Sequence, residues 1–102
     1  MMKIVAVTAC IAGLAHTYMA KSNLEKFSKQ YGHEIKVETQ GAMGLENKIS
    51  QEEVEEADVV IFAVDTNVTE RDRFSGKKIL KVTTQEAIRD GENVIKKAEN
   101  LN

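Results

Sequence analysis

Three residues able to take part in catalysis lie between positions 10 and 17 of this 102-residue chain. Cys10 is the only cysteine, and His16 and Thr17 follow it within the same short stretch. The thiolate is the reactive form of cysteine, and the start of a helix favours it because backbone N–H groups and the helix dipole point toward the sulfur. We therefore expect Cys10 to be a nucleophile that can carry a phosphoryl group.

Small residues surround this cysteine, namely Ala9, Ala12, Gly13 and Ala15. They allow the backbone to approach a phosphoryl group, whose charge of about −2 needs several hydrogen-bond donors. His16 offers a donor or a positive charge, and Thr17 offers a hydroxyl. The alternative interpretation is a small buried cysteine beside a solvated histidine, since cysteines that do no chemistry are commonly buried.

Strand and helix patterns alternate along the chain. Two apolar runs, 3–8 and 58–64, are typical of strands buried on both faces, whereas 34–38 alternates polar and apolar residues as an edge strand with one solvated face does. Ser50 and Glu53 form a capping box, and the same pattern recurs at 83–86. The predicted strands are 3–8, 34–38, 58–64 and 78–82, and the predicted helical segments are 16–31, 50–57, 70–74 and 83–101, the last kinked near residues 90 and 91.

This alternation predicts an α/β fold with three layers, in which a four-stranded parallel sheet of order 2-1-3-4 carries helices on both faces, as in Rossmann-like and flavodoxin-like proteins. No linker or repeat interrupts residues 1–102, so we expect a single domain. The strand order reverses at the carboxyl end of the first strand, where ligands of such sheets bind. That position is the one Cys10 occupies.

The composition excludes several classes of function. A net charge of −2 gives no reason to expect nucleic-acid binding, and no apolar run approaches the roughly 20 residues of a membrane helix. One cysteine cannot form an internal disulfide, so we expect a cytoplasmic protein that inserts into no membrane. We expect no cofactor and no metal, because Cys10 and His16 supply only two ligands. The start and length of the chain lead us to expect a separate subunit.

Two known kinds of site fit this loop poorly. Low-molecular-weight tyrosine phosphatases need an arginine six positions after the cysteine to grip the phosphate with two donors, and His16 stands there instead. Dinucleotide-binding turns need three glycines in the G-x-G-x-x-G pattern, and only Gly13 is present.

Residues 10–20 resemble the signature C-P-T-G-I-A-H-T-F-M-A of the fructose-type enzyme IIB domains of the bacterial phosphotransferase system. The similarity continues at matching spacing through residues 32–41, 57–61 and 73–77, and so covers most of the chain. Several separate segments make this resemblance more specific than any single motif.

The resemblance implies a phosphotransferase. The chain would accept a phosphoryl group on Cys10 from a phosphohistidine of a IIA protein and pass it to a sugar bound by the membrane subunit IIC, so that it lies in the cytoplasm, peripheral to the inner membrane through IIC. The sugar would be bound only through IIC. The phosphate-binding backbone would be that of Ile11, Ala12, Gly13, Leu14, Ala15, His16 and Thr17.

Two residues depart from the family signature, since Ile11 and Ala12 stand where it has proline and threonine. A proline would stiffen the loop, and a threonine would add a hydroxyl close to the phosphate. Two alternatives therefore stay open. One is a regulatory or binding domain of the same fold with impaired transfer, and the other is a low-molecular-weight phosphatase-like enzyme.

Other polar residues have simpler interpretations. We expect His33 to be a solvated turn residue at the far edge of the sheet, and Arg71 and Arg73 to be solvated on a helical turn. Gln40 lies at the same edge as Cys10, in a segment that either contacts a partner or merely connects two elements. We expect Asp65 to hydrogen-bond to N–H groups of the cysteine loop or to be solvated.

Overall fold

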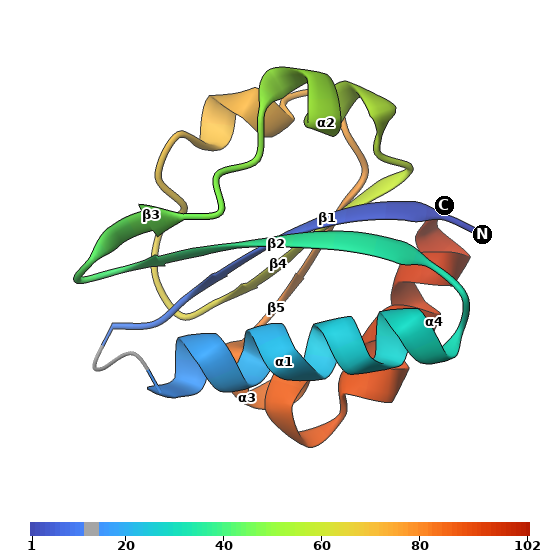
Figure 1. The fold of residues 1–102 in the computed structure, drawn as a ribbon, viewed down its shortest axis with the longest axis horizontal. Helices are drawn as coiled ribbons and strands as arrows, with labels where there is room; N and C mark the ends of the chain where they lie inside the picture. The colour runs from blue at the N-terminus through green and yellow to red at the C-terminus, as the bar shows by residue number, and fades with distance from the viewer. Residues whose placement is uncertain (12–14) are drawn as a thin grey trace.

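The structure, a computed structural model, describes residues 1–11 and 15–102 and has an α/β architecture (Figure 1). Its sheet has the order β3-β2-β1-β4-β5. The strands are β1 (Lys3–Ala9), β2 (Glu34–Gly41), β3 (Gly44–Glu46), β4 (Val59–Val64) and β5 (Ile79–Val82). The helices are α1 (Ala15–Gln30), α2 (Gln51–Glu56), the 3-10 helix η1 (Arg71–Phe74), α3 (Thr84–Arg89) and α4 (Gly91–Leu101).

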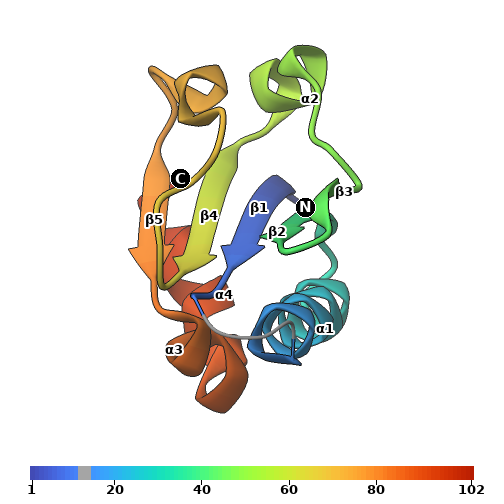
Figure 2. The ribbon, with the colours of Figure 1, turned by 90° about the vertical axis from the view of Figure 1, so that its left-hand side faces the viewer.

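The helices cover both faces of the sheet, as the sequence predicts. Helices α1, α3 and α4 lie on one face, and α2 with η1 lies on the other, which gives three layers (Figures 1 and 2). Each face has its own buried cluster, because alternate residues of a strand point to opposite faces. On β1, for example, Ile4 and Ala6 belong to one cluster and Val5 and Val7 to the other.

The two apolar runs form the centre of the sheet. Strand β1 pairs in parallel with β2 on one side and with β4 on the other, and all six residues of β4 are buried. Strand β5 pairs with β4, so the predicted order of the four parallel strands is confirmed.

The predicted count of four strands is wrong, because the sheet has a fifth. After β2 the chain reverses and β3 pairs antiparallel with it, Gly41 opposite Gly44. Gly44 has a φ of 86°, which glycine adopts without steric cost. Three residues are too few to give a recognisable strand pattern, so this element left no signal in the sequence.

The predicted solvated face of β2 is also wrong at its carboxyl end. Glu38 is fully buried, with 0% of its surface exposed. Two nitrogens of Arg73 contact its two carboxylate oxygens at 2.7 and 2.9 Å, and the N–H of Ile49 donates to it at 2.8 Å. Arg73, expected on a solvated turn, therefore points inward, whereas Arg71 is exposed as predicted.

This ion pair decides the charge state of Glu38. Burial raises the pKa of a carboxyl group, because the charged form loses its water. Hydrogen bonds from Arg73, Gln40 and the Ile49 N–H outweigh that effect, so the pKa of Glu38 lies below its ordinary value of 4.5. Glu38 is therefore a buried carboxylate that keeps its charge.

The prediction that His33 is solvated is also wrong, because its side chain is largely buried and hydrogen-bonded. Its side chain is only 8% exposed, its Nδ1 accepts a hydrogen bond from the Met2 N–H at 3.0 Å, and its Nε2 lies 2.6 Å from the Glu99 carboxylate. The residue thus joins the start of β1 to α4 at the end of the sheet opposite to Cys10.

The predicted helix boundaries hold at their caps. Ser50 and Glu53 form the full capping box of α2, and the Thr83 side chain accepts from the Glu86 N–H at the start of α3. The predicted kink is a break at Asp90, between α3 and α4. At Gly91, the first residue of α4, a β-carbon would lie 2.7 Å from the Asn23 amide nitrogen, so close packing against α1 favours glycine there.

We predict that Glu38→Gln lowers the free energy of unfolding by about 3 kcal/mol at pH 7, because Arg73 loses its buried partner. A carboxylate with a lowered pKa stabilises the fold above the pKa of the unfolded chain, and that contribution disappears as the pH falls through the lowered value. The difference between wild type and variant should therefore shrink as the pH falls below the ordinary carboxyl pKa of 4.5.

Urea unfolding at several pH values tests this expectation. Glu53→Gln is the matched control, because Glu53 pairs with Lys36 at the surface and glutamine preserves the capping box. Its effect should stay within about 1 kcal/mol. A Glu38→Gln deficit that does not change with pH would contradict the assignment.

Candidate active site

Cys10 follows the last residue of β1, at the carboxyl end of the parallel strands. In the sheet, Ala9 lies opposite Gln40 of β2 and Val64 of β4. The connection from β1 passes through α1 on one face, whereas the connection from β2 to β4 passes through α2 on the other. Figure 2 looks toward this end of the sheet. Cys10 therefore lies where the two crossovers diverge, as predicted.

The first turn of α1 contributes a side chain to the sulfur. Thr17 is buried, and its hydroxyl donates a hydrogen bond to the Sγ of Cys10 over 3.0 Å. A donor on sulfur stabilises the thiolate more than the thiol, because hydrogen bonds to charged acceptors are stronger. The sequence predicts this hydroxyl as a candidate for the site, and in the structure it donates to the sulfur.

Cys10 opens into a shallow depression of about 320 Å³. Its lining includes Gln40 and Gly41 of β2, and Thr66, Asn67 and Thr69 of the connection after β4. An open site of this kind suits a thiol that must be reached by other macromolecules. A larger hollow, of about 430 Å³, lies between β1, β2 and α2, but the described residues that line it include no cysteine, so the candidate site is the smaller one.

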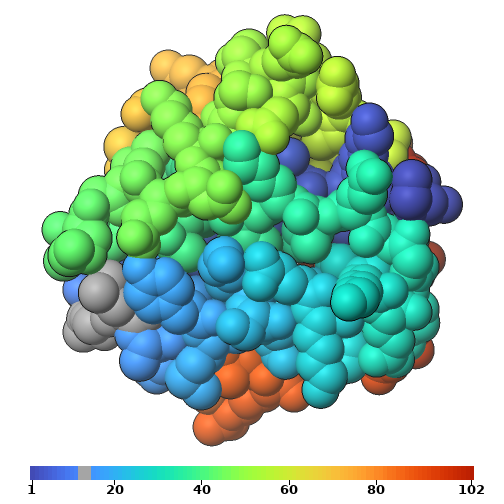
Figure 3. Space-filling model, viewed as in Figure 1, coloured from blue at the N-terminus to red at the C-terminus, as the bar shows by residue number. Residues whose placement is uncertain are grey.

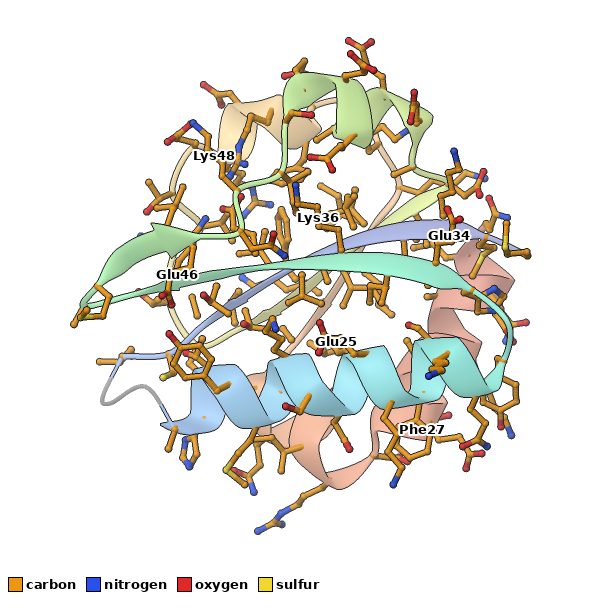
Figure 4. All side chains as sticks on the ribbon, in the orientation of Figure 1. Glu25, Phe27, Glu34, Lys36, Glu46 and Lys48 are labelled. Carbon is orange, nitrogen blue, oxygen red and sulfur yellow. The ribbon has the colours of Figure 1, made fainter. Side chains whose placement is uncertain are left out.

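Apolar and aromatic side chains surround this edge. Ile11 and Met43 are 79% and 72% exposed, and Tyr18 is partly exposed. The Tyr18 hydroxyl donates to Glu46 of β3, which points toward the start of α1 (Figure 4). In the space-filling view, the β2–β3 hairpin and the start of α1 form one surface (Figure 3).

The predicted phosphate-binding residues fall into two groups. Ala12, Gly13 and Leu14 lie outside the described residues. Of the others, Ile11, Ala15 and His16 are exposed, and Thr17 is buried against Cys10. Ala15 is the first residue of α1, so the helix begins five residues after the cysteine.

Asp65 is exposed, and its carboxylate has a partner at the start of α3. Its carboxylate accepts hydrogen bonds from the Thr84 hydroxyl at 2.5 Å and from the Thr84 N–H at 3.1 Å. Its own N–H donates to the Ala9 carbonyl at 2.9 Å. Asp65 therefore joins the end of β4 to the start of α3, where backbone N–H groups favour a negative charge.

The sequence leaves two interpretations of the segment at Gln40 open, a contact with a partner and a simple connection between two elements. The Gln40 amide makes two hydrogen bonds to the backbone of Thr69, which also lines the depression. No pattern in the sequence links these residues, because they are 29 positions apart and belong to different elements.

Two further properties concern the described residues only. Within residues 1–11 and 15–102, no three His, Cys, Asp or Glu side chains gather as a metal site would require. No helix in that part of the chain is both long and apolar enough to cross a bilayer.

Comparison with known proteins identifies the family. Residues 5–97 match the family model described as "PTS system, Lactose/Cellobiose specific IIB subunit". The "PTS system fructose-like EIIB component 2" of Escherichia coli K12 is 46% identical over 99 residues, which are 97% of this chain and 93% of that protein.

Solved structures agree with this assignment. A domain of the fructose-specific IIABC component of Borrelia burgdorferi has 49% identity and a TM-score of 0.92, covering 97% of this chain and 94% of that one. An enzyme IIB subunit from Escherichia coli K12 has 36% identity and a TM-score of 0.91, covering 98% and 93%.

The family description and the relatives name different sugars, but they agree on the IIB component. The 46% identity to the Escherichia coli protein extends over almost the whole length of both chains and supports a fructose-like IIB component. The chain belongs to the IIB family of the sugar phosphotransferase system, and it is accordingly a phosphotransferase that carries a phosphoryl group.

Proposed function

We propose that Cys10 is the residue that carries the phosphoryl group, within a single IIB domain formed by residues 1–102. The observation that supports this most directly is the position of the only cysteine, at the divergence of the two crossovers with the Thr17 hydroxyl on its sulfur. A nucleophile needs this combination of access and a group that stabilises its charged form.

The reaction takes place in two substitutions at phosphorus. The Sγ of Cys10 attacks a phosphohistidine of a IIA protein, so that a P–S bond forms while the P–N bond breaks and the histidine leaves. A hydroxyl group of the sugar then attacks the same phosphorus and releases its proton to solvent, so that a P–O bond forms while the P–S bond breaks and the thiolate returns. Both steps depend on positioning and charge stabilisation.

The backbone between Cys10 and α1 is our proposed binding site for the phosphoryl oxygens, with Ile11, Ala15, His16 and Thr17 among the described residues and Ala12, Gly13 and Leu14 outside them. Helix α1 contributes the positive end of its dipole, which favours an anion in front of it. The position of arginine in tyrosine phosphatases is taken by His16, which is exposed. This difference favours transfer between proteins over hydrolysis.

The names of longer relatives support a proposal for the partners. The fructose-specific EIIABC component of Bacillus subtilis is 46% identical over 98 residues, and this chain spans 15% of its length. A fructose-like EIIBC component occurs in Escherichia coli K12. We propose that this chain likewise receives its phosphoryl group from a IIA protein and delivers it to a fructose-like sugar held by IIC. It would then act in the cytoplasm, peripheral to the inner membrane.

We predict that the protein gains one phosphoryl group on Cys10 when it is incubated with phosphoenolpyruvate, the upstream phosphoryl donors and a fructose-type IIA protein. Mass spectrometry of the intact protein and its peptides measures this. Cys10→Ser should lose the label, because the nucleophile is gone, and the matched control His16→Ala should keep it on Cys10.

Other outcomes support other functions. Label that persists in Cys10→Ser, or that lies on His16, contradicts the proposal. Turnover of an aryl phosphate by the protein alone would favour a phosphatase. Unimpaired sugar uptake in a Cys10→Ala strain would favour the regulatory or binding domain that the residues Ile11 and Ala12 leave open.

We predict that Thr17→Val slows alkylation of Cys10 by iodoacetamide about tenfold at pH 7, because the thiolate loses a hydrogen bond worth about 1.4 kcal/mol. Thr17→Ser retains a hydroxyl and should react within about twofold of the wild type. Equal alkylation rates in the valine and serine variants would show that the hydroxyl does not activate the sulfur.

A further inference from the structure

We infer that Gln40 is a positioning residue that holds residues 65–70, the wall loop, in place for the incoming phosphoprotein. The inference rests on the proposed function, because it concerns how the donor protein reaches Cys10. The wall loop follows β4 and ends where η1 begins, and its exposed residues Thr66 and Asn67 line the depression at Cys10.

The side chain of Gln40 connects β2 to the wall loop through two hydrogen bonds, which we call the Gln40 bridge. Its Oε1 accepts a hydrogen bond from the Thr69 N–H at 2.8 Å, and its Nε2 donates to the Thr69 carbonyl at 3.1 Å. The amide therefore pairs with the backbone of Thr69 as a neighbouring strand would. Gln40 is 5% exposed and lies opposite Ala9, the residue before Cys10, so the bridge sets the distance between loop and nucleophile.

The buried ion pair fixes the orientation of this amide. A carboxylate has only acceptors, so the Gln40 Nε2, 2.7 Å from Glu38, must face it as a donor. The Oε1 must then face the Thr69 N–H. Arg73 completes the arrangement, because it grips both oxygens of Glu38 and also donates to the Thr69 carbonyl at 3.2 Å.

The residues on both sides of Thr66 and Asn67 hold the wall loop in place. Val68 is buried in the cluster between the sheet and α2, and the Asp65 N–H donates to the Ala9 carbonyl. Thr66 and Asn67 lie between these two residues and are exposed, and the Gln40 bridge follows directly at Thr69. A loop that is already ordered loses little conformational freedom when a partner binds, so its order contributes to affinity.

The wall loop and the group on the sulfur belong to different elements. Thr17, which donates to the Sγ of Cys10, lies on α1, whereas Gln40 and Thr69 lie on β2 and after β4. Loss of the bridge should therefore weaken the complex with the donor protein more than it changes the sulfur itself. In kinetic terms, KM for the donor rises and kcat changes much less.

Gln40→Met tests this, because methionine has a similar length and makes neither hydrogen bond. The matched control is Asn23→Leu, which also removes an amide with two backbone partners, the Ala87 and Ile88 carbonyls at 2.8 and 2.9 Å, but between α1 and α3. Transfer to Cys10 is measured against the concentration of a phosphorylated fructose-type IIA protein.

We expect Gln40→Met to raise KM for that protein about tenfold, and Asn23→Leu to leave KM within about twofold of the wild type. The alkylation rate of Cys10 by iodoacetamide should stay within about twofold in both. Amide hydrogen exchange at Thr69 should become faster in Gln40→Met alone, because its N–H loses its acceptor. Gln40→Leu provides a second variant if the first does not fold.

An unchanged KM in the Gln40 variants, or an equal rise in Asn23→Leu, overturns the inference while leaving the proposed function intact. Absence of any transfer to wild-type Cys10 contradicts the proposed function instead. Hydrogen exchange at Thr69 that is the same in Gln40→Met and wild type shows that the bridge does not hold the wall loop.

Discussion

The position of the site depends on one constraint of parallel sheets, which is that each strand must be followed by a crossover on one face or the other. Here the crossover after β1 uses α1 on one face, and the crossover between β2 and β4 uses α2 on the other. Cys10 follows β1 directly and lies where these two crossovers diverge. It is attached to a strand in which six of seven residues are buried, and it is itself partly exposed.

That strand explains why the chain can hold a reactive group firmly with a small core. Strand β1 pairs along its length with two neighbours, and six of its seven residues are buried. At its other end, His33 accepts a hydrogen bond from the Met2 N–H and contacts Glu99 of α4. These contacts hold the residue that precedes β1 in place. Cys10 is therefore attached to a strand that is held at both ends and along its length.

Much of this arrangement was visible in the sequence, because local patterns report local structure. The apolar runs predicted β1 and β4, the Ser50–Glu53 box predicted α2, and the loop at Cys10 followed from topology. The pairing of Glu38 with Arg73 was not visible. The two residues are 35 positions apart, and a glutamate in an alternating strand looks solvated unless its distant partner is known. The same holds for Gln40 and Thr69, and for His33 and Glu99.

Strand β3 and the Asn47 side chain cover part of the outer edge of β2. Strand β2 would otherwise expose a row of unpaired backbone groups, which can pair with strands of other molecules. Strand β3 occupies that row at residues 39–41, and the Asn47 side chain donates to the Val37 carbonyl at 3.0 Å. The shielded edge of β2 therefore favours transient contacts through side chains over aggregation through backbone pairing.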